Sequence, residues 1–271
     1  MKEEIFHLYK LLITEKIEML VVISPAKKLD ENCDNNIINK FTVPPYLENS
    51  KKIVKALRSY SVSSLSKLMN ISDKISRLNY ERYIKWSLPF NKNNSYHALL
   101  LFQGDVYKGI SVKDFDKEDF LFAQKSLRIL SGLYGILKPL DLIQPYRLEM
   151  GTQLKIGKYN DLYDFWGDEI TKSINNDKNS DYLINLASVE YFKSINTDSL
   201  KSKLINISFK EKKDGKYKII GIHAKKARGL MSRYIVKNKI TEPLELKKFN
   251  LERYKYNKIL STESDWVFTR S

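Results

Sequence analysis

Apolar runs bounded by polar or turn-forming residues predict short strands at six places along the chain. Each run has the length of a buried strand, roughly four to eight residues. Asp214 and Gly215 stand between two of the runs, and an Asp-Gly pair in that position is typical of a tight hairpin turn. The first predicted strand begins at Met19, and the others occupy residues 97–102, 181–188, 204–209, 217–224 and 266–270.

Apolar residues spaced three and four positions apart predict helices between these runs. Strands and helices follow one another without a regular βαβ repeat, so we expect an α+β fold, a single compact domain with a mixed sheet and surrounding helices. Residues 1–18 have a helical pattern of their own, which predicts an appended N-terminal helix before a domain at residues 19–271. The other helical windows are about 47–59, 61–69, 73–86, 116–130, 160–175 and 225–240.

Net charge narrows the class of partner. The chain has 47 Lys and Arg against 32 Asp and Glu, a formal net charge of +15, and an isoelectric point near 9.5. The resulting positive potential attracts polyanions, and nucleic acid is the leading class among them. The chain is also rich in lysine and asparagine, as an AT-rich coding sequence would make it, so charge alone leaves both explanations open.

Cysteine and histidine usage gives no sign of a metal site. Cys33 is the only cysteine, which excludes an intramolecular disulfide and fits a reducing cytosol. The three histidines, His7, His97 and His223, are far apart, so we expect no metal ion and no cofactor. We find no signal peptide and no run near the roughly 20 apolar residues that span a membrane, and we expect a cytoplasmic protein that does not enter membranes.

The segment at residues 223–239, HAKKARGLMSRYIVKNK, combines a basic run with a helical apolar stripe. Ala227, Leu230, Met231 and Tyr234 fall on one side of a helical wheel and predict the buried face. The opposite side carries only the small residues Gly229 and Ser232, and basic residues flank them on both sides. A solvated basic face and a phosphate-binding surface both fit this pattern.

Residues 61–86 predict two short helices joined by Asn70, Ile71 and Ser72, which is the outline of a helix-hairpin-helix. This module presents backbone amides of its hairpin to a DNA phosphate. The usual hairpin has glycines where Asn70 and Ser72 stand, and an ordinary helical hairpin fits equally well. Leu65, Leu68 and Met69 predict the buried stripe of the first helix, Ile75 and Leu78 that of the second, and the nearby cations are Lys67, Lys74 and Arg77.

Polar residues beside turns could also carry chemistry. Ser24 and Lys27 follow the first strand and could hold a phosphate or form an activated nucleophile. Asp164 and Asp168 are four residues apart, so one helix face would bring both carboxylates together, although an acid-rich first turn explains them as well. If the protein is an enzyme, the candidate residues are Ser24, Lys27, Asp105, Tyr107, Arg147, Glu149, Asp168 and Glu190.

Seven segments together resemble the bacterial YaaA family of peroxide-stress-resistance proteins, from Met19 nearly to the C-terminus. They are, in order, MLVVISPAKKLD, NISDKISRLN, FQGDVYKG, LRILSGLYGILKPLDLIQPYRLEMG, LYDFWGD, INLASVEYFKS and AKKARGLMSR.

The resemblance implies an α+β fold particular to the family, with a helix-hairpin-helix, a positively charged cleft and binding to double-stranded DNA. It also implies a part in resistance to hydrogen peroxide through limiting free iron. On this chain the hairpin corresponds to Asn70, Ile71 and Ser72 with Lys74, and the cleft to Lys27, Lys225, Lys226, Arg228 and Arg233.

Two functions follow as hypotheses. The first is a DNA-binding protein that grips duplex or distorted DNA with little sequence specificity; its protein partners are unknown. The second is an uncharacterised enzyme that acts on a nucleotide or nucleic acid, which a deep pocket gathering the polar residues would favour. Without clustered Cys and His we expect no protein-bound iron store. The candidate DNA-binding residues are Lys27, Lys67, Asn70, Ile71, Ser72, Lys74, Arg77, Lys225, Lys226, Arg228, Gly229 and Arg233.

Overall fold

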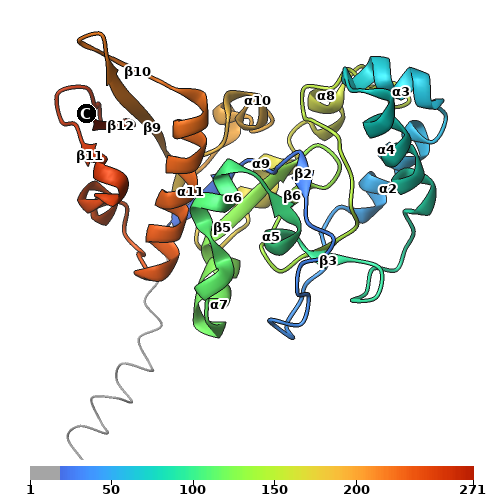
Figure 1. Ribbon diagram of the computed structural model, residues 1–271, viewed down its shortest axis with the longest axis horizontal. Helices are drawn as coiled ribbons and strands as arrows, with labels where there is room; N and C mark the ends of the chain where they lie inside the picture. The colour runs from blue at the N-terminus through green and yellow to red at the C-terminus, as the bar shows by residue number, and fades with distance from the viewer. Residues whose placement is uncertain (1–18) are drawn as a thin grey trace, which may run out of the picture.

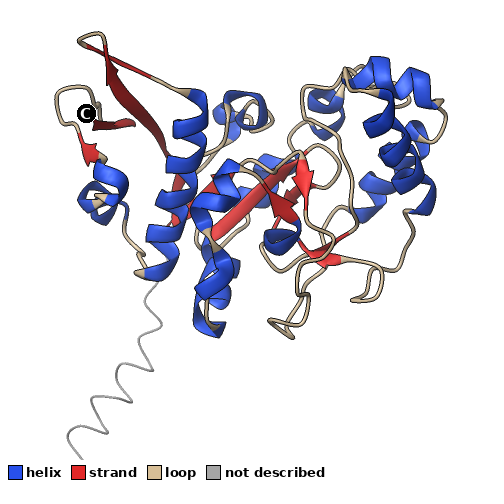
Figure 2. Ribbon diagram, in the orientation of Figure 1, coloured by secondary structure: helices blue, strands red, loops and turns tan. Residues whose placement is uncertain are grey.

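One mixed sheet of eight strands organises the chain in the computed structural model, which describes residues 19–271 (Figures 1 and 2). The helix expected at residues 1–18 lies outside the described residues. The strand order is β11-β12-β9-β8-β1-β5-β6, and β10 pairs with β9 beside this path. The strands are β1 (Met19–Ile23), β5 (Leu127–Ser131), β6 (Gly135–Leu137), β8 (Tyr182–Asn185), β9 (Lys203–Lys213), β10 (Lys216–Lys218), β11 (Lys255–Tyr256) and β12 (Asp265–Arg270).

The centre of the sheet is parallel. Strands β12, β9, β8, β1 and β5 run in one direction, while β6, β10 and β11 pair antiparallel to their neighbours. In the sheet, β5 lies on one side of β1. On the other side of β1 lie β8, β9 and β12, which follow one another outward in chain order. The connections therefore reverse direction between the adjacent strands β1 and β8. The predicted α+β class with a mixed sheet is confirmed.

Helices cover the sheet and extend the molecule at one end. Helices α7 and α11 contact the sheet strands β1, β5 and β9, and α9 contacts β6. The helices α2, α3 and α4 lie together at the far end from β12 (Figure 1). No helix within residues 19–271 combines the length and the apolar character that crossing a bilayer requires. The helices are α2 (Leu47–Leu57), α3 (Val62–Met69), α4 (Asp73–Lys85), α5 (Ala98–Leu101), α6 (Asp105–Ile110), α7 (Lys117–Ser126), α8 (Leu162–Trp166), α9 (Glu169–Asn175), α10 (Val189–Phe192) and α11 (Gly221–Lys237).

Short elements connect these parts. The strand β2 (Lys28–Leu29) pairs with β4 (Phe102–Gln103), and β3 (Tyr96–His97) pairs with β7 (Leu142–Ile143). Four short 3₁₀ segments complete the described chain: η1 (Val112–Asp114), η2 (Thr197–Ser199), η3 (Pro243–Lys248) and η4 (Leu251–Arg253).

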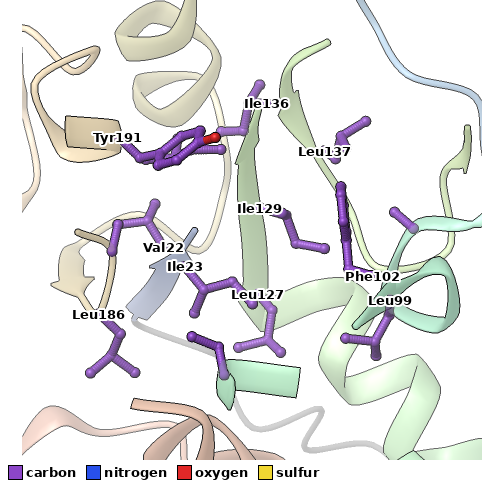
Figure 3. Packing of buried hydrophobic residues seen from close by; sticks show 14 of the residues in the cluster. Val22, Ile23, Leu99, Phe102, Leu127, Ile129, Ile136, Leu137, Leu186 and Tyr191 are labelled. Carbon is purple, nitrogen blue, oxygen red and sulfur yellow. The ribbon is translucent and has the colours of Figure 1, made fainter. Parts of the chain in front are cut away.

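The core is centred on β1 and β5. All five residues of each strand are buried, as expected for central parallel strands covered on both faces. Val22, Ile23 and Ile129 pack with side chains from α5 and from the segment after β8 (Figure 3). Arg128 is the charged exception within β5, and its guanidinium forms an ion pair with Asp177 at the edge of this core.

The run that begins at Met19 and the runs at 204–209 and 266–270 form strands, as predicted, whereas the run at 181–188 is a strand only over Tyr182–Asn185. The turn at Asp214 and Gly215 is also confirmed, because both residues have positive φ and join β9 to β10. The prediction for 97–102 is wrong, since Ala98–Leu101 is a buried helical turn. An apolar run of this length fits a buried helix as well as a strand.

Two predicted boundaries are wrong. The predicted strand at 217–224 contains only the end of β10, and α11 begins earlier than expected, at Gly221. The predicted helix at 116–130 ends at Ser126, and β5 begins at once. The charged Arg128 interrupts the apolar run of β5, which hid this strand from the pattern.

Helices α6 and α11 cross with their backbones in contact. A Cβ atom added at Gly229 would lie 1.9 Å from the carbonyl oxygen of Val106 and 2.9 Å from the Cα atom of Gly109. Gly229 and Ser232 are buried, so their predicted outward position is wrong. Their small size permits a close helix crossing rather than an approach of DNA. The predicted stripe is also too narrow, because Ile235 and Val236 are buried too.

Candidate functional site

A cavity of about 420 Å³ opens where the carboxyl ends of β1 and β8 meet. Ser24 follows β1, and Ser188 lies shortly after β8. The Ser188 backbone N–H donates to Ser24 Oγ at 2.8 Å and holds the two strand ends together. The crevice outside the strand ends where connections reverse is the usual ligand site of open parallel sheets. The volume also falls within the roughly 300–1,000 Å³ of small-molecule pockets.

Five segments that are distant in sequence form the walls of this pocket. They are the loop from β1 into β2, the start of α6, the loop at 146–149, the start of α10 and the first turns of α11. Seven of the eight polar residues proposed for an enzyme line the pocket: Ser24, Lys27, Asp105, Tyr107, Arg147, Glu149 and Glu190.

Asp168 is the eighth residue, and it lies outside the pocket lining. Gly167 has a φ of 46° and ends α8, so Asp164 and Asp168 belong to different helices. Asp168 Oδ1 accepts a hydrogen bond from the Asn196 side chain at 2.8 Å. The predicted pairing of the two carboxylates on one helix face is therefore wrong, because glycine breaks the helix between them.

Glu149 is the centre of an ion-pair cluster in the pocket. Its Oε1 atom lies 2.9 Å from Lys27 Nζ and 3.1 Å from an Arg147 guanidinium nitrogen. Glu149 Oε2 and Arg147 Nε are both buried without a hydrogen-bond partner in the described chain. Ser24 has Ser188 as its partner and Lys27 has Glu149, so these two residues do not form the nucleophile pair considered from the sequence.

Three tyrosines give the pocket an aromatic lining. Tyr107 donates from its hydroxyl to the Ser24 carbonyl at 3.2 Å. Tyr146 exchanges a hydrogen bond of 2.6 Å with the Ser131 hydroxyl, and Tyr191 lies at the start of the α10 wall. Burial raises the pKa of Tyr107 and of Tyr191 well above the usual range of tyrosine. These hydroxyls are therefore neutral, and the rings provide an apolar surface rather than a base.

Lys28, Lys225 and Arg228 are the cations of the pocket wall that have no partner of opposite charge. Within residues 19–271 no carboxylate forms an ion pair with any of them, and Arg228 Nε is buried without a hydrogen-bond partner. Burial lowers the pKa of Arg228, and no acidic neighbour opposes that effect. A partly desolvated guanidinium without an anion is costly, so a bound anion would stabilise it.

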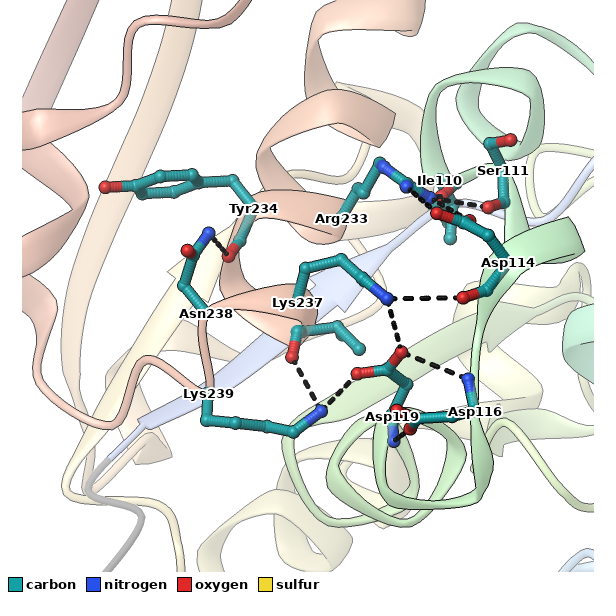
Figure 4. A network of polar contacts seen from close by, with 11 residues as sticks. Ile110, Ser111, Asp114, Asp116, Asp119, Arg233, Tyr234, Lys237, Asn238 and Lys239 are labelled. Carbon is teal, nitrogen blue, oxygen red and sulfur yellow. Dashed lines mark hydrogen bonds and ion pairs between the residues drawn. The ribbon is translucent and has the colours of Figure 1, made fainter.

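Two other cations of the predicted cleft have partners elsewhere. Lys226 forms an ion pair with Glu252. Arg233 forms two hydrogen bonds with the Asp114 carboxylate and also donates to the carbonyl oxygens of Ile110 and Ser111 (Figure 4). The predicted cleft thus divides: Lys27, Lys225 and Arg228 line the pocket, whereas Lys226 and Arg233 bind carboxylates of the protein itself.

The hairpin between α3 and α4 has its predicted helices and turn. Asn70 adopts a left-handed conformation, with φ at 50°. Its amide donates to the Lys67 carbonyl at 3.3 Å, and the Ile71 amide donates to the Ser66 carbonyl at 3.0 Å. Both amides thus close the end of α3, and the phosphate-binding hairpin remains a prediction. Lys67, Lys74 and Arg77 are exposed and form no ion pair within the described residues.

The two helices of this hairpin differ in how well the sequence predicts their buried face. Leu65 and Met69 of α3 are buried as predicted. In α4 the buried residues are Ser76, Asn79 and Tyr83, whereas Leu78 is 45% exposed, so the predicted stripe of Ile75 and Leu78 is wrong. The Tyr83 hydroxyl donates to the Arg147 carbonyl, which anchors the pocket loop to α4.

Several residues of the pocket wall were not predicted from the sequence. Ser188 is the last residue of the predicted strand at 181–188, and its position at that end was a usable signal, because ligand sites gather at the carboxyl ends of strands. Lys28 is adjacent to Lys27, which the sequence did suggest as a candidate site residue. Tyr146 and Tyr191 gave no signal, since an isolated tyrosine in an apolar context resembles an ordinary core residue.

Comparison with known proteins gives one consistent result. A family model described as peroxide stress protein YaaA matches residues 19–260. A UPF0246 protein of Acaryochloris marina is 54% identical over 254 residues, which cover 93% of this chain and 100% of that protein. UPF0246 proteins of Colwellia psychrerythraea and Saccharophagus degradans are 50% and 51% identical over 255 residues, which cover 93% of this chain and 99% of each protein.

Proposed function

Because the chain belongs to the family of peroxide stress protein YaaA, we propose that it binds DNA as its part in the response to peroxide. Duplex or distorted DNA is gripped with little sequence preference. Its phosphates lie against the unpaired cations of the pocket wall, Lys28, Lys225 and Arg228. The exposed cations of the α3–α4 hairpin, Lys67, Lys74 and Arg77, form a second basic surface for the same duplex.

The state of Arg228 is the observation that carries this proposal. Arg228 is partly buried beside the pocket, and no carboxylate within residues 19–271 pairs with it. Native proteins rarely leave a buried charged group unpaired, since desolvation makes it costly. A phosphate that approaches through the pocket mouth satisfies the guanidinium with charge-assisted hydrogen bonds.

The test replaces Lys28, Lys225 and Arg228 together with Gln. Each phosphate contact releases condensed counterions, so the slope of log K against log salt should become shallower by about 0.9 per cation, or up to about 2.7. Affinity should fall for all duplex sequences alike. Equilibrium binding to one labelled duplex at several salt concentrations measures both quantities.

A second variant replaces Lys67, Lys74 and Arg77 with Gln, which removes the same charge from the hairpin, and its affinity and salt slope should fall as well. If only this second variant loses affinity, the hairpin is the DNA surface and the pocket is not. If neither variant changes the affinity or the salt slope, DNA binding through these cations is wrong. Circular dichroism and melting temperature establish that both variants are folded.

A second candidate function is an enzyme that acts on a nucleotide or nucleic acid. The gathering of seven candidate polar residues in one pocket favours it, because a surface that only binds phosphate has no need of the carboxylates of Asp105, Glu149 and Glu190. Mass spectrometry of nucleotides and short oligonucleotides after incubation with the protein tests this function. A product that Glu190→Gln no longer forms would establish it, and unchanged substrates at high enzyme concentration would count against it.

The link to limiting free iron is part of the same proposal, as an effect in the cell rather than as storage in this pocket. We expect the purified protein to pass through a desalting column without stoichiometric iron. Iron that stays bound at one equivalent, measured by metal analysis, would contradict this expectation.

A further inference from the structure

Strand β9 continues past the edge of the sheet where the pocket opens. It runs parallel to β8, whose last residue, Asn185, lies opposite Asn206. Lys213, the last residue of β9, lies seven positions beyond Asn206, which is about 23 Å along an extended strand. The neighbour on the other side, β12, accompanies β9 only as far as Glu211. The β9–β10 hairpin, residues 211–218, therefore projects from the carboxyl edge of the sheet (Figure 1).

The tip of this hairpin is exposed and strongly basic. All residues of the turn and of β10 are exposed, and so are the last two residues of β9. Within residues 19–271 no carboxylate forms an ion pair with Lys212, Lys213 or Lys216. The base of the hairpin is anchored to the fold, because Glu211 forms an ion pair with Arg270 at 2.7 Å. A fixed base thus carries a positive tip.

The charges of the tip oppose its stability. Lys213 lies directly opposite Lys216, and like charges in that position destabilise a strand pair. The carboxylate of Asp214 pairs with Lys218, at 3.7 Å, and with neither lysine of this pair. Lysine also protects exposed edge strands against pairing with other chains, but that role does not require two lysines to face each other. An anionic partner would neutralise both of them.

Both faces of the ribbon carry positive charge, which distinguishes a groove from a flat surface as its partner. Side chains alternate along a strand, so Lys212 points to one face, while Lys213 and Lys216 point to the other. A bilayer presents its phosphates in one plane. The major groove of a duplex has a phosphate backbone on each side, is about 12 Å wide and about 8.5 Å deep, and admits a two-stranded ribbon.

The dimensions of the tip also fit this groove. Asp214 and Gly215 both have positive φ and form a two-residue turn, so the tip is no wider than two strands. Lys213 lies two residues beyond Glu211, where pairing with β12 ends, so the ribbon projects about 7 Å on its own. That length is less than the depth of the groove.

We propose that the β9–β10 hairpin enters the major groove of duplex DNA, with Lys212 facing one phosphate backbone and Lys213 and Lys216 facing the other. This inference rests on the proposed DNA binding and adds a surface that is separate from the pocket cations and from the α3–α4 hairpin. Because the β9–β10 hairpin rises from the same edge of the sheet as the pocket, one duplex lying across that edge meets both.

The first experiment replaces Lys213 and Lys216 together with Gln. If both lysines contact phosphates, the slope of log K against log salt should become shallower by up to about 1.8, and affinity for a duplex at physiological salt should fall about tenfold or more. The melting temperature should stay the same or rise slightly, because the repulsion between the two lysines is removed. Lys212→Gln, on the opposite face, should make the slope shallower by about 0.9.

The matched control replaces Lys201 and Lys203 together with Gln. These lysines lie at the other end of β9, with Lys203 about 33 Å from Lys213 along an extended strand. No carboxylate in the described part of the chain forms an ion pair with either of them. The control removes the same charge, and it should leave the affinity and the salt slope unchanged.

The second experiment tests entry into the groove. In one duplex every cytosine carries a glucosylated hydroxymethyl group, which fills the major groove and leaves the backbone charge unchanged. The other duplex has the same sequence with ordinary cytosine. The wild type should bind the glucosylated duplex at least about fivefold more weakly, because the ribbon no longer has room in the groove. The variant without Lys213 and Lys216 should bind both duplexes alike.

The outcomes separate this inference from the proposed function. If the wild type binds no duplex, the proposed function fails and this inference fails with it. If binding needs Lys28, Lys225 and Arg228 but is unaffected by the hairpin variants, the proposed function stands and this inference is wrong. Equal binding of both duplexes by the wild type also overturns it, because the hairpin then stays outside the groove. If replacing Lys213 and Lys216 abolishes binding to phosphatidylserine vesicles and leaves DNA binding intact, the hairpin belongs to a membrane surface instead.

Discussion

The two parts of α11 carry similar charge but use it in opposite ways. In the first turns, Lys225 and Arg228 line the pocket and have no carboxylate partner among the described residues. Toward the end, Arg233 binds Asp114, while Lys237 and the following Lys239 both bind the buried carboxylate of Asp119 (Figure 4).

This difference shows that a basic run is not one functional unit. The cations near the end of α11 join it to the segment before and within α7, so they stabilise the fold. Near its start, Lys225 and Arg228 have no carboxylate partner within residues 19–271, whereas Lys226 between them pairs with Glu252. Gly229 separates the two parts and sets the distance between α11 and α6. Partners across the fold, and not the number of positive charges, decide which cations can bind a ligand.

Changing Gly229 should have the largest effect, because it disturbs both parts of α11 at once. The added methyl group of Gly229→Ala would lie 1.9 Å from the Val106 carbonyl oxygen, so α6 and α11 must separate. We expect a loss of at least about 3 kcal/mol in the free energy of unfolding, at the upper end of overpacking costs. Denaturant unfolding measures it.

Gly221→Ala is the control for this prediction. Nothing lies within 4 Å of a Cβ atom at Gly221, which is also in α11. Alanine is the better helix former, so stability should stay the same or rise slightly. Equal losses at the two positions would show that any substitution of glycine in this helix is harmful and that the crossing with α6 is not special.

Replacing Arg233 near the end of α11 should destabilise the protein, whereas replacing Arg228 near its start should not. Arg233→Gln removes the pair with Asp114 and leaves the carbonyls of Ile110 and Ser111 without their charged donor. We expect a loss of about 2 kcal/mol, since hydrogen bonds to charged groups contribute roughly 1.5–3 kcal/mol. Arg228→Gln should leave stability unchanged or raise it, because no carboxylate among the described residues pairs with Arg228. A similar loss in both variants would contradict the comparison.

Acid should weaken the end of α11 and not its start. A hydrogen bond from Arg233 lowers the pKa of Asp114, and although burial alone would raise the pKa of Asp119, hydrogen bonds from Lys237 and Lys239 lower it below its ordinary 3.8. Because these folded-state pKa values lie below the unfolded ones, the stabilisation is present above about pH 4 and is lost as pH falls through the folded values. Melting temperatures from pH 6 to pH 3 should fall less steeply in Asp119→Asn than in the wild type. Parallel curves would show that this carboxylate contributes nothing.

The sequence predicted the strands that are simple apolar runs, and it predicted most polar residues of the pocket. Ser24, Asp105 and Glu149 could be chosen because each polar side chain lies beside a turn near a strand or helix end. The fate of Arg233 could not be predicted, since Asp114 is 119 residues away in the sequence. The outward face assigned to Gly229 failed for the same reason, because a helical wheel shows one helix and not its neighbour α6.

The smallest expected effect concerns two adjacent lysines, Lys225 and Lys226, of which only Lys226 has a carboxylate partner among the described residues. Lys226 is paired with Glu252 on a partly exposed surface, and such pairs usually contribute less than about 1 kcal/mol. Lys226→Gln should therefore change both stability and DNA affinity only slightly. Lys225 lines the pocket and has no carboxylate partner in the described part of the chain, so Lys225→Gln should make the slope of log K against log salt shallower by about 0.9. The two variants have the same net charge and the same helix position within one residue, which removes long-range electrostatics as an explanation. If both variants change the slope equally, DNA responds to the total charge of the basic run, and the pairing of individual cations does not decide which of them contact phosphate.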